Sequence, residues 1–182
     1  QESGPASPPY AMGLMTLLAT VTMLFAAFTA ALLVRRTGTD WERVALPGIL
    51  WVNVAVLCAS SVLLEGARSA VRGGRMEAAT RRLGLAALLG LLFLAGQVAA
   101  WRQLALQGVL LPTGPHAAFF YVLSALHAAH VIGGLAALGW TLRRLTAGAY
   151  TPTRCTGLTH AAVYWHFMGG VWLYLFGLLL LL

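Results

Sequence analysis

Four histidines in the C-terminal part of the chain have side chains that could bind a metal ion or a haem. His127 and His130 are three residues apart, so they share one face if their segment is helical, and His160 and His166 follow in the last apolar stretch. Neutral imidazole is a common ligand of zinc and of haem iron. The alternative role for the same side chains is hydrogen bonding between neighbouring helices.

The positions of these histidines favour hydrogen bonding over ligation. A b-type haem would need histidines from two helices at matching depth. His130 lies near the middle of its apolar stretch, whereas His166 lies about four residues from the middle of the next one, or roughly 6 Å of helix. Zinc would need three or four converging ligands, and no cysteine or carboxylate lies near His127 and His130 in the sequence. We therefore expect His127, His130 and His166 to make hydrogen bonds between helices.

The composition identifies the elements that must position these side chains. The chain has 182 residues, of which 59% are hydrophobic and 9% are charged, against roughly 25% charged residues in a soluble domain. This excludes a soluble enzyme, a nucleic-acid-binding domain and a disordered chain, and leaves an integral membrane protein. The apolar runs are continuous rather than alternating, which excludes the strands of a β-barrel.

The few charged residues divide the chain into membrane-spanning segments of about 20 residues. We predict an all-α polytopic membrane protein, with a polar tail at residues 1–10 and a single domain at residues 11–182. The five expected transmembrane helices cover about residues 11–34, 46–67, 82–104, 117–142 and 159–182.

The arginines predict how the chain is oriented. All twelve basic residues are arginine, and the chain has only five acidic residues, which gives a net charge of +7. The second and fourth expected loops hold five and three arginines, and the first and third hold three and one. The positive-inside rule then places the N-terminus in the cytoplasm and the C-terminus outside. No acidic residue lies deep in an expected helix, which argues against independent proton transport.

The cysteines, two of the tryptophans and a stripe of small residues also allow predictions. Cys58 and Cys155 are expected to be free thiols, because two isolated cysteines make no disulfide framework. Trp165 and Trp172 lie inside the last apolar stretch and are expected to pack against a partner. A stripe of small residues at every fourth position is typical of helices that approach closely in lipid. It consists of Ala125, Ala129, Gly133 and Ala137.

Two segments resemble subunit III of the haem–copper oxidases, above all of cytochrome c oxidase. Residues 164–167 read Tyr-Trp-His-Phe and run into an apolar Trp-Leu stretch, and residues 127–131 read His-Ala-Ala-His-Val. The family carries both patterns. The resemblance covers about residues 11–182 and implies a short bacterial form that lacks the first two helices of the seven-helix members. The structural family-motif positions are Gln97, His127, His130, Trp165 and His166.

The resemblance implies a subunit without a catalytic, cofactor or metal site of its own. Haem and copper are then expected on partner subunits, and bound phospholipid is compatible with the family. The expected partners are oxidase subunits I and II, membrane lipids and cytochrome c as electron donor, with no nucleic acid. The chain would pack on subunit I in the bacterial inner membrane. There it would support stability, proton uptake and oxygen access during the reduction of O2 to water.

The sequence departs from the family at three positions that are commonly acidic, which are here Val21, Ala100 and Gly169. Any role of those carboxylates in the family is therefore in doubt for this chain. Two alternatives remain open at this point. One is the same subunit type in a quinol oxidase or nitric-oxide-reductase assembly, and the other is a b-haem electron-transfer membrane protein.

Overall fold

The computed structural model describes residues 9–42, 44–151 and 155–181, and five helices in this part are long and apolar enough to cross a membrane. The predicted all-α class is confirmed. The predicted polar tail at residues 1–10 lies outside the described residues except at its end, because the first helix already begins at Pro9. The elements are α1 (Pro9–Arg35), α2 (Ile49–Arg72), α3 (Met76–Leu106), the short 3-10 helix η1 (Leu111–Thr113), α4 (Pro115–Thr146) and α5 (Thr156–Leu181).

The largest difference from the predicted bounds lies between α2 and α3. The helix predicted at 46–67 starts later, after Pro47, and continues through its arginines to Arg72. The helix predicted at 82–104 starts earlier, at Met76, and so includes Arg81 and Arg82. Arginine is a good helix former, so the charge that ends the apolar run does not end the helix. The turn is confined to residues 73–75, where Gly74 has φ +71°, a conformation that glycine adopts without strain.

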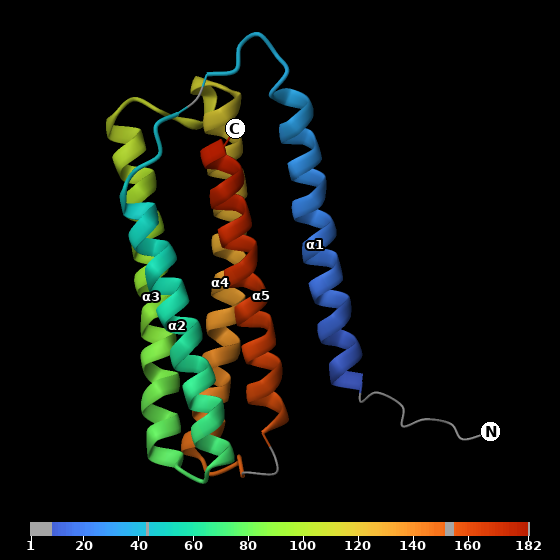
Figure 1. The fold of residues 1–182 in the computed structure, drawn as a ribbon, viewed down its shortest axis with the longest axis vertical. Helices are drawn as coiled ribbons and strands as arrows, with labels where there is room; N and C mark the ends of the chain where they lie inside the picture. The colour runs from blue at the N-terminus through green and yellow to red at the C-terminus, as the bar shows by residue number, and fades with distance from the viewer. Residues whose placement is uncertain (1–8, 43, 152–154, 182) are drawn as a thin grey trace, which may run out of the picture.

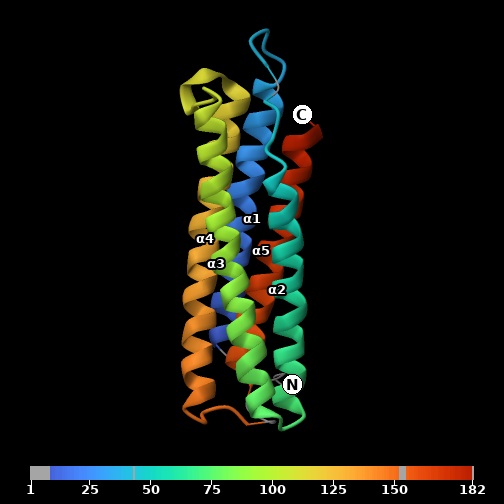
Figure 2. The same ribbon diagram turned by 90° about the vertical axis from the view of Figure 1, so that its left-hand side faces the viewer.

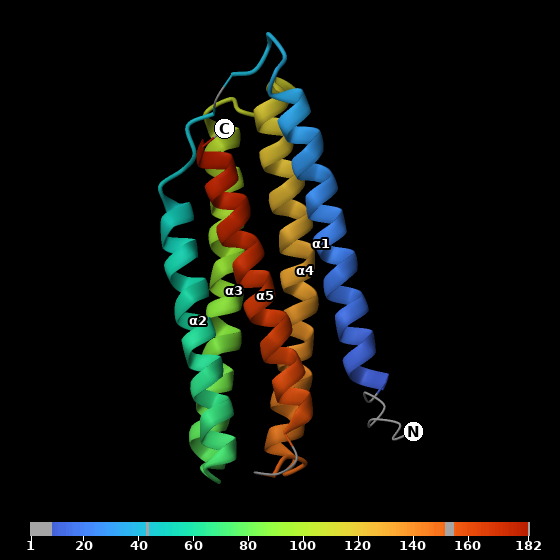
Figure 3. The ribbon, with the colours of Figure 1, turned by 45° about the vertical axis from the view of Figure 1, so that its right-hand side comes forward.

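Helices α2 to α5 form a four-helix bundle in which α2 and α4 each lie between α3 and α5. Helix α1 is attached to one side of this bundle, and within the described residues it contacts only α4 and α5. Figure 1 shows α1 running along one side of the bundle, and Figure 3 shows that its Pro9 end lies farther from α4 than its Arg35 end. The fold therefore consists of a compact bundle and one more loosely attached helix.

The connections lie alternately at the two ends of the long axis, as Figure 2 shows. The α2–α3 turn and the α4–α5 connection share the end at which α1 begins, and the seven described arginines there define what we call the basic end. They are Arg68, Arg72, Arg75, Arg81, Arg82, Arg143 and Arg144. The opposite end holds Arg35, Arg36 and Arg102, while Arg43 and Arg154 lie outside the described residues. The side of the membrane on which each end lies stays a prediction.

The indole of Trp165 is the centre of the bundle. It is 1% exposed, and its Nε1–H donates to Ser60 Oγ of α2 at 3.0 Å, while that hydroxyl donates to the carbonyl of Ala86 on α3 at 2.9 Å. Two glycines give the ring its space. A Cβ at Gly90 would lie 2.6 Å from the Trp165 ring, and one at Gly134 would lie 3.1 Å from it. Trp165 and Trp172, expected to face a partner, are both buried within this chain.

The small-residue stripe of α4 does not have the predicted packing role. Ala125, Ala129 and Gly133 are exposed, and the nearest atom that a Cβ at Gly133 would meet is the Tyr164 hydroxyl oxygen at 3.9 Å. Gly134, one residue outside the stripe, is the position that makes close contact. A shift of one residue rotates a side chain by about 100° around the helix, so the stripe faces away from α5 toward α1.

Candidate functional site

His127 lies in the core of the bundle and makes no hydrogen bond to another helix. The side chain is fully buried, and within the described residues neither ring nitrogen has a hydrogen-bond partner. Its ring stacks on Trp172 of α5 with centroids 5.0 Å apart, and the ring of Phe93 on α3 meets it edge-on at 5.7 Å. The predicted hydrogen bond between helices is therefore wrong for His127, because its neighbours on α3 and α5 are aromatic rings.

His130 makes its side-chain hydrogen bond within α4. Its Nδ1–H donates to the carbonyl oxygen of Leu126, one turn earlier, at 2.7 Å. The prediction of a bond between helices is therefore also wrong for this ring. The backbone of His130 does link helices, since its carbonyl oxygen accepts a hydrogen bond from the Tyr164 hydroxyl of α5 at 3.0 Å. The ring also lies 5.8 Å from the ring of Phe25, which brings α1 against α4.

His166 links α5 to α2, as predicted. Its Nε2 donates to Glu65 Oε1 at 2.8 Å, and the same carboxylate oxygen accepts a hydrogen bond from Arg68 at 2.5 Å. Glu65 lies about two turns before the end of α2 rather than at the end of the helix, because α2 continues to Arg72. The carboxylate is half-exposed and is compensated by both neighbours. This cluster ties the two helices together near the basic end.

The described histidines, cysteines and carboxylates do not gather into a set of ligands. Within residues 9–42, 44–151 and 155–181, no three of these side chains are placed to hold a metal ion. His127 and His130 lie on α4, while His166 is turned toward Glu65 on the far side of α5. Cys58 and Cys155 are free thiols, as predicted. Of the motif side chains, Trp165 and His166 make hydrogen bonds between helices.

A groove of about 560 Å³ lies where α1 diverges from α4 and α5, and we call it the α1 groove. Its floor includes Ala129, Gly133 and Ala137 of the small-residue stripe, and its wall includes Leu14 and Leu17 of α1. Toward the basic end, Arg144 and His160 line it, and the Arg144 guanidinium lies 5.9 Å from the ring centroid of Tyr150. The groove is thus apolar along its length and cationic at one end. No pattern in the sequence predicted it.

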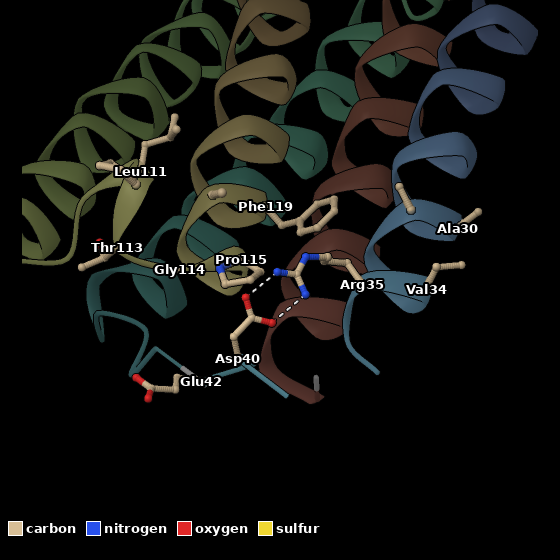
Figure 4. A pocket seen from close by; sticks show the side chains of 13 residues that line it. Ala30, Val34, Arg35, Asp40, Glu42, Leu111, Thr113, Gly114, Pro115 and Phe119 are labelled. Carbon is tan, nitrogen blue, oxygen red and sulfur yellow. Dashed lines mark hydrogen bonds and ion pairs between the residues drawn. The ribbon is translucent and has the colours of Figure 1, made fainter. Parts of the chain in front are cut away.

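A second cavity, of about 1060 Å³, lies at the opposite end between the last turn of α1 and the start of α4 (Figure 4). Arg35 Nη1 donates to Asp40 Oδ1 at 2.7 Å across its rim, and Phe119 of α4 points into the same space. The hydrogen bond from Arg35 holds the pKa of the Asp40 carboxyl below its ordinary value. Both side chains are exposed, so this ion pair lies at the surface and is not part of the core. It links the end of α1 to the loop that leads to α2.

The three positions that lack the family's acidic residues differ in their surroundings. Val21 and Ala100 are buried among apolar side chains. Gly169 instead lines a groove of about 330 Å³ between α2 and α5, where an added Cβ would lie 3.8 Å from Ser61 Oγ. The structure therefore has room for a larger side chain at Gly169 only.

Comparisons with known proteins agree with this arrangement. The family model described as cytochrome c oxidase subunit III matches residues 10–181. A cytochrome c oxidase subunit 3 of Synechocystis sp. is 33% identical over 174 residues, which cover 91% of this chain and 72% of that protein. One of Thermostichus vulcanus is 32% identical, covering 94% and 86%, and one of Corynebacterium diphtheriae is 29% identical, covering 91% and 84%.

Proposed function

This chain belongs to the cytochrome c oxidase subunit III family, and we propose on that basis that it is the non-redox subunit of a bacterial haem–copper cytochrome c oxidase. It packs on subunit I beside subunit II, in an inner membrane with its basic end in the cytoplasm. Cytochrome c supplies electrons to the complex, and the haem and copper centres that reduce O2 to water belong to the partner subunits.

The use made of the motif side chains carries this proposal. Trp165 and His166 bond to Ser60 and Glu65 on α2, and the hydroxyl of Tyr164 bonds to the backbone of α4. Hydrogen bonds of this kind hold membrane helices together, because the lipid offers no competing partners. Because the side chains of residues 164–166 all bond to other helices of this chain, they support a structural role in the complex.

The supporting roles in proton uptake and oxygen access rest on two surfaces. Toward the basic end, the half-exposed carboxylate of Glu65 is hydrogen-bonded to Arg68 and His166, and a carboxylate within a membrane helix is a group that can relay protons. The apolar grooves between the helices offer O2 a path that avoids water. Both features support the proposal that this subunit serves a neighbouring catalytic subunit.

The α1 groove is proposed to hold a phospholipid. Small side chains leave space for an acyl chain, and Arg144 with His160 stands where a phosphate group would meet the membrane surface. Arg144→Gln should reduce the phospholipid that stays with the purified complex, and Arg143→Gln is the matched control, since this neighbour is exposed but does not line the groove. Equal retention in both variants, measured by native mass spectrometry, would contradict the lipid proposal.

The supporting role is tested by comparing the oxidase prepared with and without this chain. We expect the initial rate of oxygen consumption to be largely kept without it, and the activity to decay faster during turnover. Adding the chain back should restore the longer lifetime. The same decay in both preparations would contradict the proposed role in stability.

A further inference from the structure

A cluster of three polar side chains in the core of the bundle has no part in the function proposed above. Gln97 of α3, His127 of α4 and Trp172 of α5 are 1%, 0% and 1% exposed. None of their side-chain polar atoms has a hydrogen-bond partner within the described residues. These atoms are Gln97 Oε1 and Nε2, His127 Nδ1 and Nε2, and Trp172 Nε1.

The three side chains occupy one region of the core. The His127 and Trp172 rings are stacked with an interplanar angle of 28°, and Phe93 meets the two rings edge-on at 5.7 and 5.2 Å. Gln97 follows Phe93 by four residues on α3, so the two side chains leave that helix on the same side. Gln97 therefore lies one turn along α3 from the ring that contacts both His127 and Trp172.

Such a cluster is costly unless the polar atoms find partners. An unpaired buried donor or acceptor costs about 1–3 kcal/mol, and the great majority of buried polar atoms in proteins bond to protein or to ordered water. Direct pairing cannot satisfy this set, because the glutamine amide, the indole and a neutral imidazole offer more N–H donors than acceptors. A water oxygen accepts two of those donors, and its two hydrogens serve the Gln97 carbonyl and the free imidazole nitrogen.

We infer that the space between Gln97, His127 and Trp172 is a binding site for internal water. At least one water molecule bridges the Gln97 amide and the His127 ring, and the Trp172 indole N–H is a further donor to it. The bridge joins α3, α4 and α5 through a polar contact in the interior of the bundle. This inference depends on the interior of this chain alone and is independent of the partner subunits.

The direct test is a cryo-electron microscopy structure of the intact complex at a resolution that shows ordered water. The expected result is a density peak within hydrogen-bond distance of both the Gln97 amide and a His127 ring nitrogen. A direct hydrogen bond from Gln97 to His127 with no such peak would overturn the inference.

A double-mutant cycle in the intact complex gives an independent answer. Gln97→Leu and Trp172→Phe should each lower the melting temperature by several degrees. The double variant should lose clearly less than the sum of the two, because both changes remove the same bridge. Gln103→Leu on the same helix and Trp140→Phe, which change exposed side chains, should shift the melting temperature little. Fully additive losses would count against a shared water, and if a variant does not assemble, the density alone decides.

Discussion

Helix α1 and the four-helix bundle are held in place by different means. In the bundle, glycines let helices approach a buried tryptophan, and polar side chains bond from one helix to another. In α1, the hydroxyls of Thr16, Thr20 and Thr22 bond to carbonyls of their own helix instead. A described side-chain bond between α1 and another helix runs from the Tyr174 hydroxyl to Thr29 Oγ1 at 3.1 Å.

The difference shows what decides helix association in a chain of this composition. All five helices are apolar, and lipid is as apolar as a leucine side chain, so hydrophobicity alone does not choose which helices associate. Close packing and hydrogen bonds make that choice, and both are concentrated in α2 to α5. We therefore expect changes in the bundle to destabilise the whole subunit, and changes in α1 to release that helix only.

The largest effect is expected from Trp165→Ala. It opens a cavity in the centre of the bundle and removes the hydrogen bond to Ser60, which should cost about 5 kcal/mol. The variant should fail to remain in the purified complex or should melt far below the wild type. Trp140→Ala is the matched control, because Trp140 is an exposed tryptophan on α4. Similar losses in both variants would show that Trp165 is not the centre of the bundle.

Phe25→Ala tests the attachment of α1. Phe25 is buried against the rings of His127 and His130, and truncating a buried phenylalanine costs about 3 kcal/mol. We expect faster amide hydrogen exchange in α1 with little change in α2 to α5. Met23→Ala, which changes an exposed side chain two residues away, should leave the exchange of α1 unchanged. Equal acceleration in all five helices would contradict the separation of the two regions.

Gly90→Ala tests the close approach on which the bundle depends. The added methyl would press on the Trp165 ring, and overpacking of this kind costs about 1–3 kcal/mol. Gly84→Ala on the same helix meets no atom within 4 Å and should be neutral or stabilise the helix by up to about 1 kcal/mol. The melting temperatures of the two variants measure the contrast. Melting temperatures that change in the same direction by the same amount in both variants would contradict the close approach at Gly90.

Asp40→Asn is expected to have the smallest effect, because the ion pair with Arg35 is exposed to solvent. Since the pKa of Asp40 is lower in the folded chain, the pair stabilises the fold at pH values above the unfolded pKa of about 4. That contribution is lost as the pH falls through the folded-state value. Melting curves from neutral to acidic pH should converge for wild type and variant at the acidic end. A Glu42→Gln variant controls for the loss of an acidic residue from the same cavity.

The number and class of the helices could be predicted because they depend on the composition of continuous segments. The composition of single segments could not predict which side chains meet across helices. Glu65 and His166 are hydrogen-bonded although they are 101 residues apart in the sequence. Their contact depends on how α2 and α5 are rotated about their axes, and no local pattern encodes that rotation. The same rotation decides that Gly134 rather than Gly133 meets Trp165, and that His127 faces aromatic rings.

The most direct test of the account is purification of this chain from its native membrane in a mild detergent, followed by mass spectrometry of the proteins that accompany it. We expect subunit I of a haem–copper oxidase to be recovered with it in equal amount, together with subunit II. Recovery of the chain without any haem–copper oxidase subunit I would contradict it.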